Sequence, residues 1–336
     1  MSKYKIKDAT FFITGGAGFV GSYIIEELLP HKPKKIFILD NMIRGCYKNM
    51  KNFINNPTIE LFEEDIRNTD LVNELMSKSD YCFHLAAMRI NRCAENTREA
   101  FDVMLKSTFE IVEAAKKHKI KKLIYSSSAS VYGLAQNFPT PETDNPYDNK
   151  TFYGAAKMFG EQLLRCYHDM YGLNYVALRY FNIYGPRMDT EGKYTEVMIK
   201  WLDCIRDNKQ PLIYGKGTTS MDFVYITDIA KANIRALLSD VSDEVFNIGV
   251  SKETSLHELL DLLLKINNSK LTPKYMPENT INPVSKRIAD ISKAKKQLGF
   301  EPEINLEEGL KSLSDWYFEQ VKEKQHDPHC EAISDK

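Results

Sequence analysis

The first half of the chain alternates short apolar runs with longer segments in which apolar residues recur every three or four positions. The longer segments predict helices over residues 19–29, 68–76 and 97–119. The short runs are rich in β-branched and aromatic residues and predict strands buried on both faces: ATFFIT, KIFILD, IELFEED, DYCFHLA and KKLIYSSS. Strands that alternate with helices are typical of a Rossmann-type, doubly wound parallel sheet of the α/β class.

The second half begins with one more such unit and then changes character. A helix is predicted over residues 152–171, and the strand NYVALRYF follows it. After Pro186 the alternation loosens, and further helices are predicted over 255–266 and 306–317. This pattern predicts a smaller C-terminal α/β substrate lobe that caps the carboxyl edge of the sheet.

The predicted domains are discontinuous, because the segment DFVYITDIAKA is expected to return to the main sheet. We expect three regions: residues 1–180 with about 222–250 as the sheet domain, 181–221 with 251–322 as the lobe, and 323–336 as a polar tail.

Composition and charge exclude several classes of protein. Of the 336 residues 43% are hydrophobic, which is enough for a large core, and 45 basic residues face 46 acidic ones. We therefore expect no nucleic-acid-binding surface. No apolar run reaches the roughly 20 residues that span a bilayer, and the charged start MSKYKIKDAT predicts no signal peptide.

The six cysteines are scattered, at positions 46, 82, 93, 166, 204 and 330. None of them has a close partner at metal-ligand spacing, so we expect reduced thiols, a cytoplasmic protein and no metal site. The tail brings His326, His329 and Cys330 together, which could bind a metal, but a disordered polar end is the favoured interpretation.

The segment TGGAGFVG directly follows the first predicted strand and opens a helix. In a dinucleotide-binding loop, Gly15 permits the tight turn, Gly18 lets the backbone approach a pyrophosphate, and Gly21 lets the helix pack on the strand. Asp40 ends the second strand, about 20 residues further on, where a carboxylate binds the ribose hydroxyls and favours NAD over NADP. Arg44 lies too far past that strand to outweigh Asp40 as a 2′-phosphate ligand.

Two later strand ends complete the expected cofactor site. Asp65 ends the third strand, where it would meet the adenine edge, and HLAA, residues 84–87, ends the fourth with small residues. His84 itself is interpreted as a packed strand histidine and not as a catalyst.

Tyr153 and Lys157 are four positions apart on the predicted helix and therefore share one face. A lysine ammonium beside a tyrosine lowers the pKa of the phenol, which would allow Tyr153 to take a proton from an alcohol as hydride leaves for NAD. Ser128, in the hydroxyl-rich SSSASVYG, would hydrogen-bond to the same oxygen. The alternative, an ordinary surface Tyr–Lys pair, is disfavoured by the phosphate loop and the hydroxyl-rich strand end.

These motifs together resemble the extended short-chain dehydrogenase/reductase family, specifically its nucleotide-sugar epimerases and dehydratases. The resemblance rests on TGGAGFVG, LDN, HLAA, SSSASVYG, YGAAK, LRYFNIYGPR, DFVYITDIA and ADISKAKKQLGF. It implies a Rossmann domain that retains NAD, a lobe that binds a UDP- or GDP-linked sugar, and a homodimer that pairs helices 97–119 and 152–171.

The resemblance also implies roles for particular residues. Ser128, Tyr153 and Lys157 would be catalytic, and the substrate would contact Arg89, Ser128, Tyr153, Asn182 and Arg287. The implied cofactor contacts are Gly15, Gly18, Phe19, Val20, Gly21, Asp40, Asn41, Asp65, Ile66, Leu85, Ala86, Ala87, Tyr153, Lys157 and Phe181.

Differences from the family pattern reduce the number of reactions that the chain is expected to catalyse. Dehydratases carry Thr-Asp-Glu, and decarboxylases keep the glutamate, where this chain has Ser128-Ala129-Ser130, so the segment resembles that of 4-epimerases. Met221 replaces the usual arginine before DFVYI, which could move a diphosphate contact to Arg287, and Met104 replaces a common asparagine. These features resemble bacterial epimerases of surface-polysaccharide pathways.

The sequence therefore predicts NAD-dependent epimerisation of a nucleoside-diphosphate sugar, most simply at C4 through a 4-keto intermediate. Oxidation to a released keto sugar, or inversion at another carbon, is the alternative. A non-catalytic NAD-binding sensor is disfavoured, because the chain keeps both Tyr153 and Lys157.

Overall fold

The computed structural model of the protein describes residues 3–145, 148–190, 195–277 and 284–326. Its centre is a seven-stranded sheet with the strand order β11-β6-β5-β4-β1-β2-β3, in which every neighbouring pair is parallel. The strands are β1 (Thr10–Thr14), β2 (Lys35–Asp40), β3 (Ile59–Glu63), β4 (Tyr81–His84), β5 (Lys122–Ser128), β6 (Tyr175–Tyr180) and β11 (Glu244–Ile248). The expected Rossmann-type sheet is confirmed.

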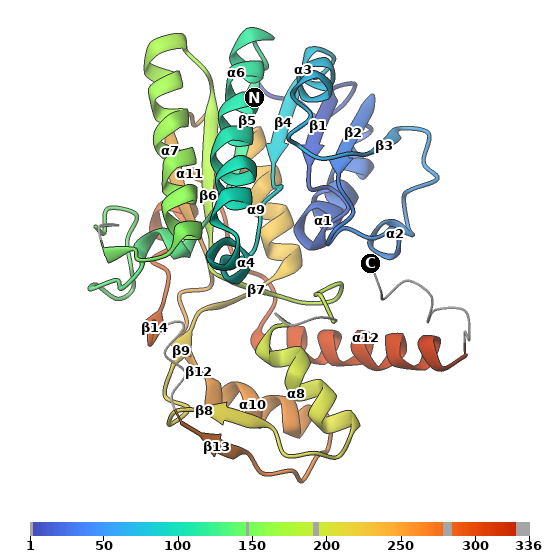
Figure 1. The fold of residues 1–336 in the computed structure, drawn as a ribbon, viewed down its shortest axis with the longest axis vertical. Helices are drawn as coiled ribbons and strands as arrows, with labels where there is room; N and C mark the ends of the chain where they lie inside the picture. Colours follow the sequence, from blue (N-terminus) through green and yellow to red (C-terminus); the bar gives the residue numbers. More distant parts are fainter. Residues whose placement is uncertain (1–2, 146–147, 191–194, 278–283, 327–336) are drawn as a thin grey trace.

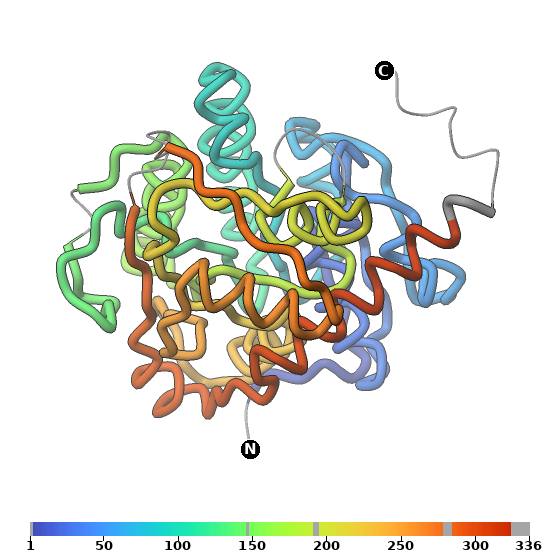
Figure 2. The backbone as a smooth tube through the Cα atoms, turned by 90° about the horizontal axis from the view of Figure 1, so that it is seen from below, coloured from blue at the N-terminus to red at the C-terminus, as the bar shows by residue number. Residues whose placement is uncertain are grey.

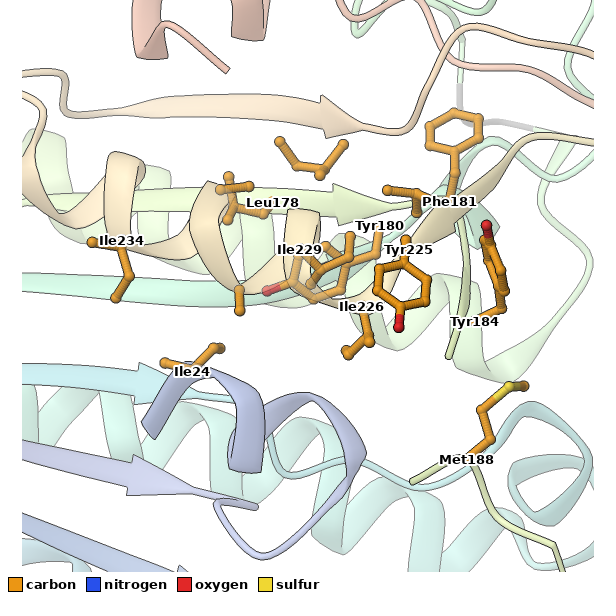
Figure 3. Close-up of a cluster of buried hydrophobic side chains, with 14 of the residues drawn as sticks. Ile24, Leu178, Tyr180, Phe181, Tyr184, Met188, Tyr225, Ile226, Ile229 and Ile234 are labelled. Atoms are coloured by element: carbon orange, nitrogen blue, oxygen red, sulfur yellow. The ribbon is translucent and has the colours of Figure 1, made fainter. Parts of the chain in front are cut away.

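Helices cover both faces of this sheet (Figure 1). One face is covered by α1 (Phe19–Leu28) and α9 (Ile226–Leu238), and Figure 3 shows Ile24 of α1 near Ile226 and Ile229 of α9 in a shared apolar cluster. The other face packs against α3 (Thr69–Ser77), α6 (Ser107–Lys117) and α7 (Phe152–Tyr171). Apolar residues therefore bury the sheet from both sides, as the continuous strand runs predict.

The lobe lies below the carboxyl ends of the strands, and its yellow, orange and red segments are in front of the sheet in the view from below (Figures 1 and 2). It is built from α8 (Val197–Arg206), α10 (Leu256–Ile266), α12 (Leu306–His326) and short strands. The small sheets pair β8 (Leu212–Tyr214) with β13 (Lys274–Met276), and β9 (Ser220–Met221) with both β12 (Thr254–Ser255) and β14 (Lys286–Arg287).

Short elements connect these parts. They are η1 (Leu29–His31), α2 (Tyr47–Met50), α4 (Ile90–Glu95), α5 (Thr97–Ala100), η3 (Ala129–Tyr132), β7 (Asn182–Tyr184), β10 (Phe223–Tyr225) and α11 (Ser292–Leu298).

Three details differ from the sequence-based expectation. The helix expected over 97–119 contains a π-helical segment, η2 (Phe101–Lys106), between α5 and α6. The last helix, α12, runs to His326 and so extends into the expected tail. The strand of DFVYI, β10, pairs with β7 and not with the main sheet, although α9, which follows it, packs against α1, β5 and β6. The domain boundaries given above stay a prediction.

Candidate active site

The glycine-rich loop turns tightly between β1 and α1. Gly15 has a φ of +73°, and a Cβ atom there would lie 2.9 Å from the backbone nitrogen of Ala86. A Cβ on Gly21 would lie 2.4 Å from the carbonyl oxygen of Gly15, so only glycine permits this helix–loop contact. The loop therefore has the backbone-lined form that fits a dinucleotide pyrophosphate at the N-terminus of α1, with Gly18 as the helix N-cap.

The ends of β2 and β4 are fastened to this loop. Asp40, buried at the end of β2, accepts hydrogen bonds from the backbone nitrogens of Ala17 and Met42, both at 3.0 Å, and burial raises its pKa. The Thr14 hydroxyl accepts from the backbone nitrogens of Leu85 and Ala86 at 3.2 Å. These hydrogen bonds thus hold the ends of β1, β2 and β4 in one arrangement.

Asp65 lies two residues past the end of β3 and is already paired. Arg67 donates to both of its carboxylate oxygens, at 2.8 and 2.9 Å, and Asn41 donates to one of them at 2.8 Å. Although partial burial alone would raise it, these bonds lower the pKa of Asp65 to about 2. The sequence analysis did not identify Arg67, which holds the carboxylate of Asp65 in place.

The remaining expected cofactor residues lie along the same edge. Phe19 and Val20 form the first turn of α1, Ile66 is buried beyond β3, and Ala87 follows β4. Phe181 is buried between β6 and β7, where Figure 3 shows it near Tyr184.

Ser128 and Tyr153 come together at the carboxyl end of β5. Ser128 is the last residue of that strand, Tyr153 lies in the first turn of α7, and their side chains share a hydrogen bond. Lys157, one turn further along, is buried and donates to the carbonyl oxygen of Ser126 at 2.6 Å, with its nitrogen 5.7 Å from the centre of the Tyr153 ring. The predicted triad is thus assembled by two adjacent elements.

The pKa of Tyr153 differs from the value expected from the sequence. Burial raises the pKa of Tyr153, while the hydrogen bond with Ser128 and the positive charges of Arg44 and Arg287 act to lower it. The expectation that Lys157 brings this pKa below its usual value is wrong for this structure, because the removal from water outweighs the nearby charges. Burial also lowers the pKa of Lys157 to about 8.

A buried polar network that the sequence analysis missed supports the triad. Glu161, one turn after Lys157, forms a bidentate ion pair with Arg179 of β6, at 2.9 and 2.6 Å, and accepts a hydrogen bond from the hydroxyl of Ser127. Arg179 also donates to the hydroxyl of Tyr132 at 2.8 Å. The network therefore holds α7, β5 and the turn after Ser128 together.

The network continues to β11 of the main sheet and to the segment that follows β14. The Tyr132 hydroxyl donates to the side-chain oxygen of Asn247 at 2.6 Å, and the Asn247 amide donates to the carbonyl oxygens of Thr140 and Asp290. The sequence contains one sign of this network, because its polar residues interrupt otherwise apolar segments. Arg179 within NYVALRYF is an example.

Arg287 lies beside Met221 in the lobe. Their strands, β14 and β9, are parallel and bring the two residues into register. Partial burial lowers the pKa of Arg287 to about 10, and Tyr153 acts to raise it. Among the described residues, no carboxylate acts on its guanidinium, which suits it for an external anion. Asn182, in β7, donates its side-chain amide to the carbonyl oxygen of Asp222 at 3.3 Å.

Arg89 is the N-cap residue of α4, and one of its nitrogens lies 3.2 Å from a carboxylate oxygen of Asp189. It follows β4, which is the neighbour of β1 in the main sheet.

His84 is buried, its ring is hydrogen-bonded to Thr14 at 2.8 Å and Thr108 at 3.0 Å, and burial lowers its pKa to about 3, as expected of a packed strand histidine. No cluster of three potential metal ligands and no membrane-spanning helix is found in the described part of the chain. His329 and Cys330 of the tail lie outside the described residues.

Comparison with known proteins agrees with this site. Residues 11–249 match the model of the NAD dependent epimerase/dehydratase family, and the chain belongs to that family. A protein of Methanocaldococcus jannaschii, provisionally named a UDP-glucose 4-epimerase, is 35% identical over 90% of this chain and 97% of its own length.

Two further similarities bear on the reaction. The solved structure of a UDP-N-acetylglucosamine 4-epimerase from Methanobrevibacter ruminantium, in complex with UDP-N-acetylmuramic acid, is 34% identical, with a TM-score of 0.88 over 94% of this chain and 99% of that one. A UDP-N-acetyl-alpha-D-glucosaminuronate decarboxylase of Bacillus cytotoxicus is 31% identical over 91% of this chain and 97% of its own length. The predicted family, NAD dependence and nucleotide-sugar epimerase class are confirmed.

Proposed function

We propose that the protein is a UDP-sugar 4-epimerase in which Tyr153 is the acid–base catalyst. The observation that carries this proposal is the hydrogen bond between Ser128 and Tyr153 at the carboxyl end of β5, with Lys157 buried beside it. Similarity to proteins named as UDP-sugar epimerases supports UDP as the nucleotide and C4 as the inverted carbon.

In the proposed reaction Tyr153 takes the proton of the C4 hydroxyl, and Ser128 hydrogen-bonds to the same oxygen. NAD, held by the glycine-rich loop and Asp40, would supply the hydride acceptor and donor for C4. The 4-keto sugar turns about its phosphate linkage between the two transfers, so the hydrogen returns on the opposite face while Tyr153 gives its proton back. Lys157 lies beside the ring, where a positive charge opposes, but does not outweigh, the effect of burial on the pKa of Tyr153.

The residues that follow Ser128 argue against elimination of water. Ala129 is buried and has no ionisable group, and the backbone nitrogen of Ser130 donates to the hydroxyl of Ser128 at 3.1 Å. Neither residue supplies the acid and base that elimination requires, so reversible oxidation is the reaction that the segment supports.

We assign the diphosphate of the substrate to Arg287 and to Asn182 of β7, whose backbones are both hydrogen-bonded to the backbone of Asp222. Two observations support this role for Arg287. Its guanidinium interacts electrostatically with Tyr153. It is also in register with Met221, the position at which the family usually has an arginine. A guanidinium suits a phosphate because it offers paired donors.

The direct test is incubation of the purified protein with UDP-glucose, UDP-N-acetylglucosamine, UDP-glucuronic acid and GDP-mannose, followed by proton NMR. We expect the C4 epimer of at least one UDP-sugar, without net NADH. If none of these substrates gives a C4 epimer while the protein retains NAD, the proposal is wrong.

Similarity to the B. cytotoxicus decarboxylase makes release of a keto sugar, or inversion elsewhere, the second candidate. Accumulation of NADH, evolution of carbon dioxide from a UDP-uronic acid, or solvent deuterium beside the carbonyl would favour it. The absence of a carboxyl group at positions 129 and 130 argues for the first candidate.

We also propose that the protein forms a homodimer through η2, α6 and α7. These elements carry exposed large apolar side chains, among them Met170, which is 66% exposed, and Tyr171, Phe101 and Phe109. Met170→Asp should shift the protein from dimer to monomer in sedimentation velocity. Sedimentation of the unmodified protein as a monomer at micromolar concentration would rule the proposal out.

A cytoplasmic site of action and a role in polysaccharide biosynthesis complete the proposal. The described cysteines, at positions 46, 82, 93, 166 and 204, are all free thiols, as in a reducing compartment. Epimerised nucleotide sugars are donors for glycosyl transfer, which is the class of reaction that would consume the product.

A further inference from the structure

Lysines are concentrated in three segments at the amino ends of the main strands. The segments are KYKIKDA (3–9), HKPKK (31–35) and KKHKIKK (116–122), and they hold three, three and five lysines, with Asp8 as their single acidic residue. They lead into β1, β2 and β5. Because the whole chain has 45 basic and 46 acidic residues, this is a local excess of positive charge that the total conceals.

Backbone hydrogen bonds hold the three segments side by side. The nitrogen of Asp8 donates to the carbonyl oxygen of Lys32 at 3.1 Å, which joins the first segment to the second. Asp80, just before β4, donates to the carbonyl oxygen of Thr10 and accepts from the nitrogen of Lys121, both at 2.8 Å, which joins the third segment to the start of β1. The three segments therefore form one surface, which we call the lysine edge.

The first segment presents its lysines to solvent through an alternating pattern. Tyr4 and Ile6 are buried, while Lys3, Lys5 and Lys7 are exposed. Side chains at every second position of an extended segment point to the same side. The two buried residues thus fix the segment on the protein and direct its lysines outward.

Part of the positive charge at this edge is not neutralised. Lys121 pairs with Asp80 at 2.8 Å, and Lys35 pairs with Glu60 at 2.9 Å. Other lysines of the edge are exposed and have no carboxylate within ion-pair distance among the residues that the structure describes: Lys5, Lys7, Lys32, Lys34 and Lys119. These side chains are available to an anionic partner.

Two of the unpaired lysines occupy backbone positions that favour glycine. Lys32, which ends η1, has a φ of +57°, and Lys119, which follows α6, has a φ of +52°. Glycine or asparagine usually ends a helix in this left-handed conformation, because a larger side chain strains the backbone there. The backbone gains nothing from lysine at these positions, so what the two residues contribute is their charge.

The lysine edge lies at the opposite end of the main sheet from the candidate active site. The glycine-rich loop, Ser128 and the lobe lie at the carboxyl ends of the strands, and the lysines lie at the amino ends (Figure 1). With a rise of about 3.3 Å per residue, the seven residues of β5 put Lys122 roughly 20 Å from Ser128. A partner bound at the lysine edge would therefore leave the active site open.

The composition of the edge indicates the kind of partner. The three segments contain no arginine, tryptophan or phenylalanine, and their one tyrosine, Tyr4, is buried. Single-stranded nucleic acids are bound with the help of aromatic stacking, and protein partners with buried aromatic or arginine anchors. Lysine charge alone suits an anionic lipid surface, where each lysine strengthens binding about fivefold.

We propose that the lysine edge binds the surface of an anionic lipid bilayer, with the active site turned away from the lipid. The contact is peripheral, because the three segments expose lysines and no large apolar side chain. It lies outside the proposed epimerase reaction and does not depend on it.

The test is flotation of the purified protein with lipid vesicles at low ionic strength. The protein should bind vesicles of equal parts phosphatidylglycerol and phosphatidylcholine, and it should not bind vesicles of phosphatidylcholine alone. Added sodium chloride should release it, because salt screens exposed charges. Failure to bind the anionic vesicles, or equal binding to both kinds of vesicle, would overturn the proposal.

Lys32→Gly combined with Lys119→Gly tests the edge itself. Loss of two lysines should weaken binding to the anionic vesicles about 10- to 30-fold. The melting temperature should be equal to or higher than that of the unmodified protein, because glycine relieves the left-handed backbone. Weaker binding in a variant that is no less stable cannot come from misfolding.

Lys200→Gln combined with Lys270→Gln is the matched control, because it removes the same charge from two exposed lysines of the lobe, on α8 and after α10. It should bind the vesicles as the unmodified protein does. Equal weakening in both double variants would overturn the proposal, since total charge would then decide binding. Tighter binding to double-stranded DNA than to the anionic vesicles at the same salt would overturn it in favour of nucleic acid. Flotation needs no turnover, so failure of the epimerase assay would not affect this result.

Discussion

The proposed catalytic edge, at Ser128 and Tyr153, and the proposed sugar-nucleotide edge, at Arg287, are built in different ways. At the catalytic edge, Ser128 and Tyr153 lie on long elements, and the polar groups behind them are buried and bonded to one another through Glu161 and Arg179. At the other edge, Arg287 lies on a strand of two residues and has no carboxylate partner among the described residues. The polar groups of the first edge are paired with one another, whereas the second edge has a cation that can pair with an anion.

This difference separates the two parts of catalysis. A preorganised acid–base pair lowers the barrier of the chemical step, because its groups need not reorganise during the reaction. An unpaired guanidinium contributes to binding, because it gains most when a phosphate arrives. Changes at the catalytic edge should therefore lower kcat or stability, and changes at the other edge should raise KM.

Replacement of the acid–base catalyst should give the largest effect. Tyr153→Phe removes the proton acceptor and should lower kcat about 10³- to 10⁴-fold, while KM for the UDP-sugar changes little. Steady-state kinetics with NMR detection of the product measures both values. Tyr275→Phe, at a half-exposed tyrosine of the lobe, is the control and should stay near the unmodified rate. Equal activity of Tyr153→Phe and the unmodified protein would remove Tyr153 from the mechanism.

Breaking the buried network should mainly cost stability. Glu161→Gln leaves Arg179 with an uncompensated buried charge and should lower the free energy of unfolding by about 3–5 kcal/mol. Urea unfolding measures this change. The control is Glu74→Gln, which removes a surface pair with Lys78 and should change stability by less than about 1 kcal/mol.

Similar losses in Glu161→Gln and Glu74→Gln would contradict the contrast between the two edges. Ser127→Ala offers a milder change at the same network, since it removes only the hydroxyl that donates to Glu161. It should fold, and a lower kcat at unchanged KM would show that the network positions Ser128.

Most of the fold could be predicted from the sequence because its signals are local. A strand that is buried on both faces must be a continuous apolar run, and a helix between such strands must have an apolar stripe. The prediction failed where pairing depends on distant residues. The strand Phe223–Tyr225 has the composition of the main strands, yet it pairs with Asn182–Tyr184 in a separate sheet.

The part of the candidate site that consists of sequence motifs could be predicted. Tyr153, Lys157 and the glycines have fixed spacings, so their places in one site could be predicted from the sequence, while their roles stay predictions. Glu161 and Arg179 could not be paired from sequence, because they meet only when α7 packs on β6. The pKa of Tyr153 was misjudged for the same reason, since burial is a property of the folded molecule.

Titration of Asp222, a residue between the two edges, should give a smaller, pH-dependent effect on the free energy of unfolding. It accepts hydrogen bonds from the backbone nitrogens of Val250, Ser251 and Ala289, and burial raises its pKa to about 6. Between pH 4 and about 6 the folded state then binds more protons than the unfolded state, so the contribution of Asp222 to stability is present below pH 4 and is lost as pH rises through 6.

The size of this contribution is up to about 3 kcal/mol, from the difference between the raised pKa and its ordinary value. It is measured as the change in the free energy of urea unfolding between pH 4.5 and 7.5, compared with the same change in Asp222→Asn. A pH dependence that is identical in the two proteins would show that Asp222 titrates normally.

The sugar-nucleotide edge should give the smallest effect on the chemical step. Arg287→Met removes the proposed diphosphate contact and should raise KM for the UDP-sugar about 10- to 100-fold with little change in kcat. Because Met221 is in register with Arg287, Met221→Arg in the Arg287→Met background should recover part of the affinity. Lys286→Met, which removes a surface pair with Glu253, is the matched control and should leave KM within about threefold. A fall in kcat at constant KM in Arg287→Met would mean that this edge, too, acts on the chemical step, and the contrast between the two edges would not hold.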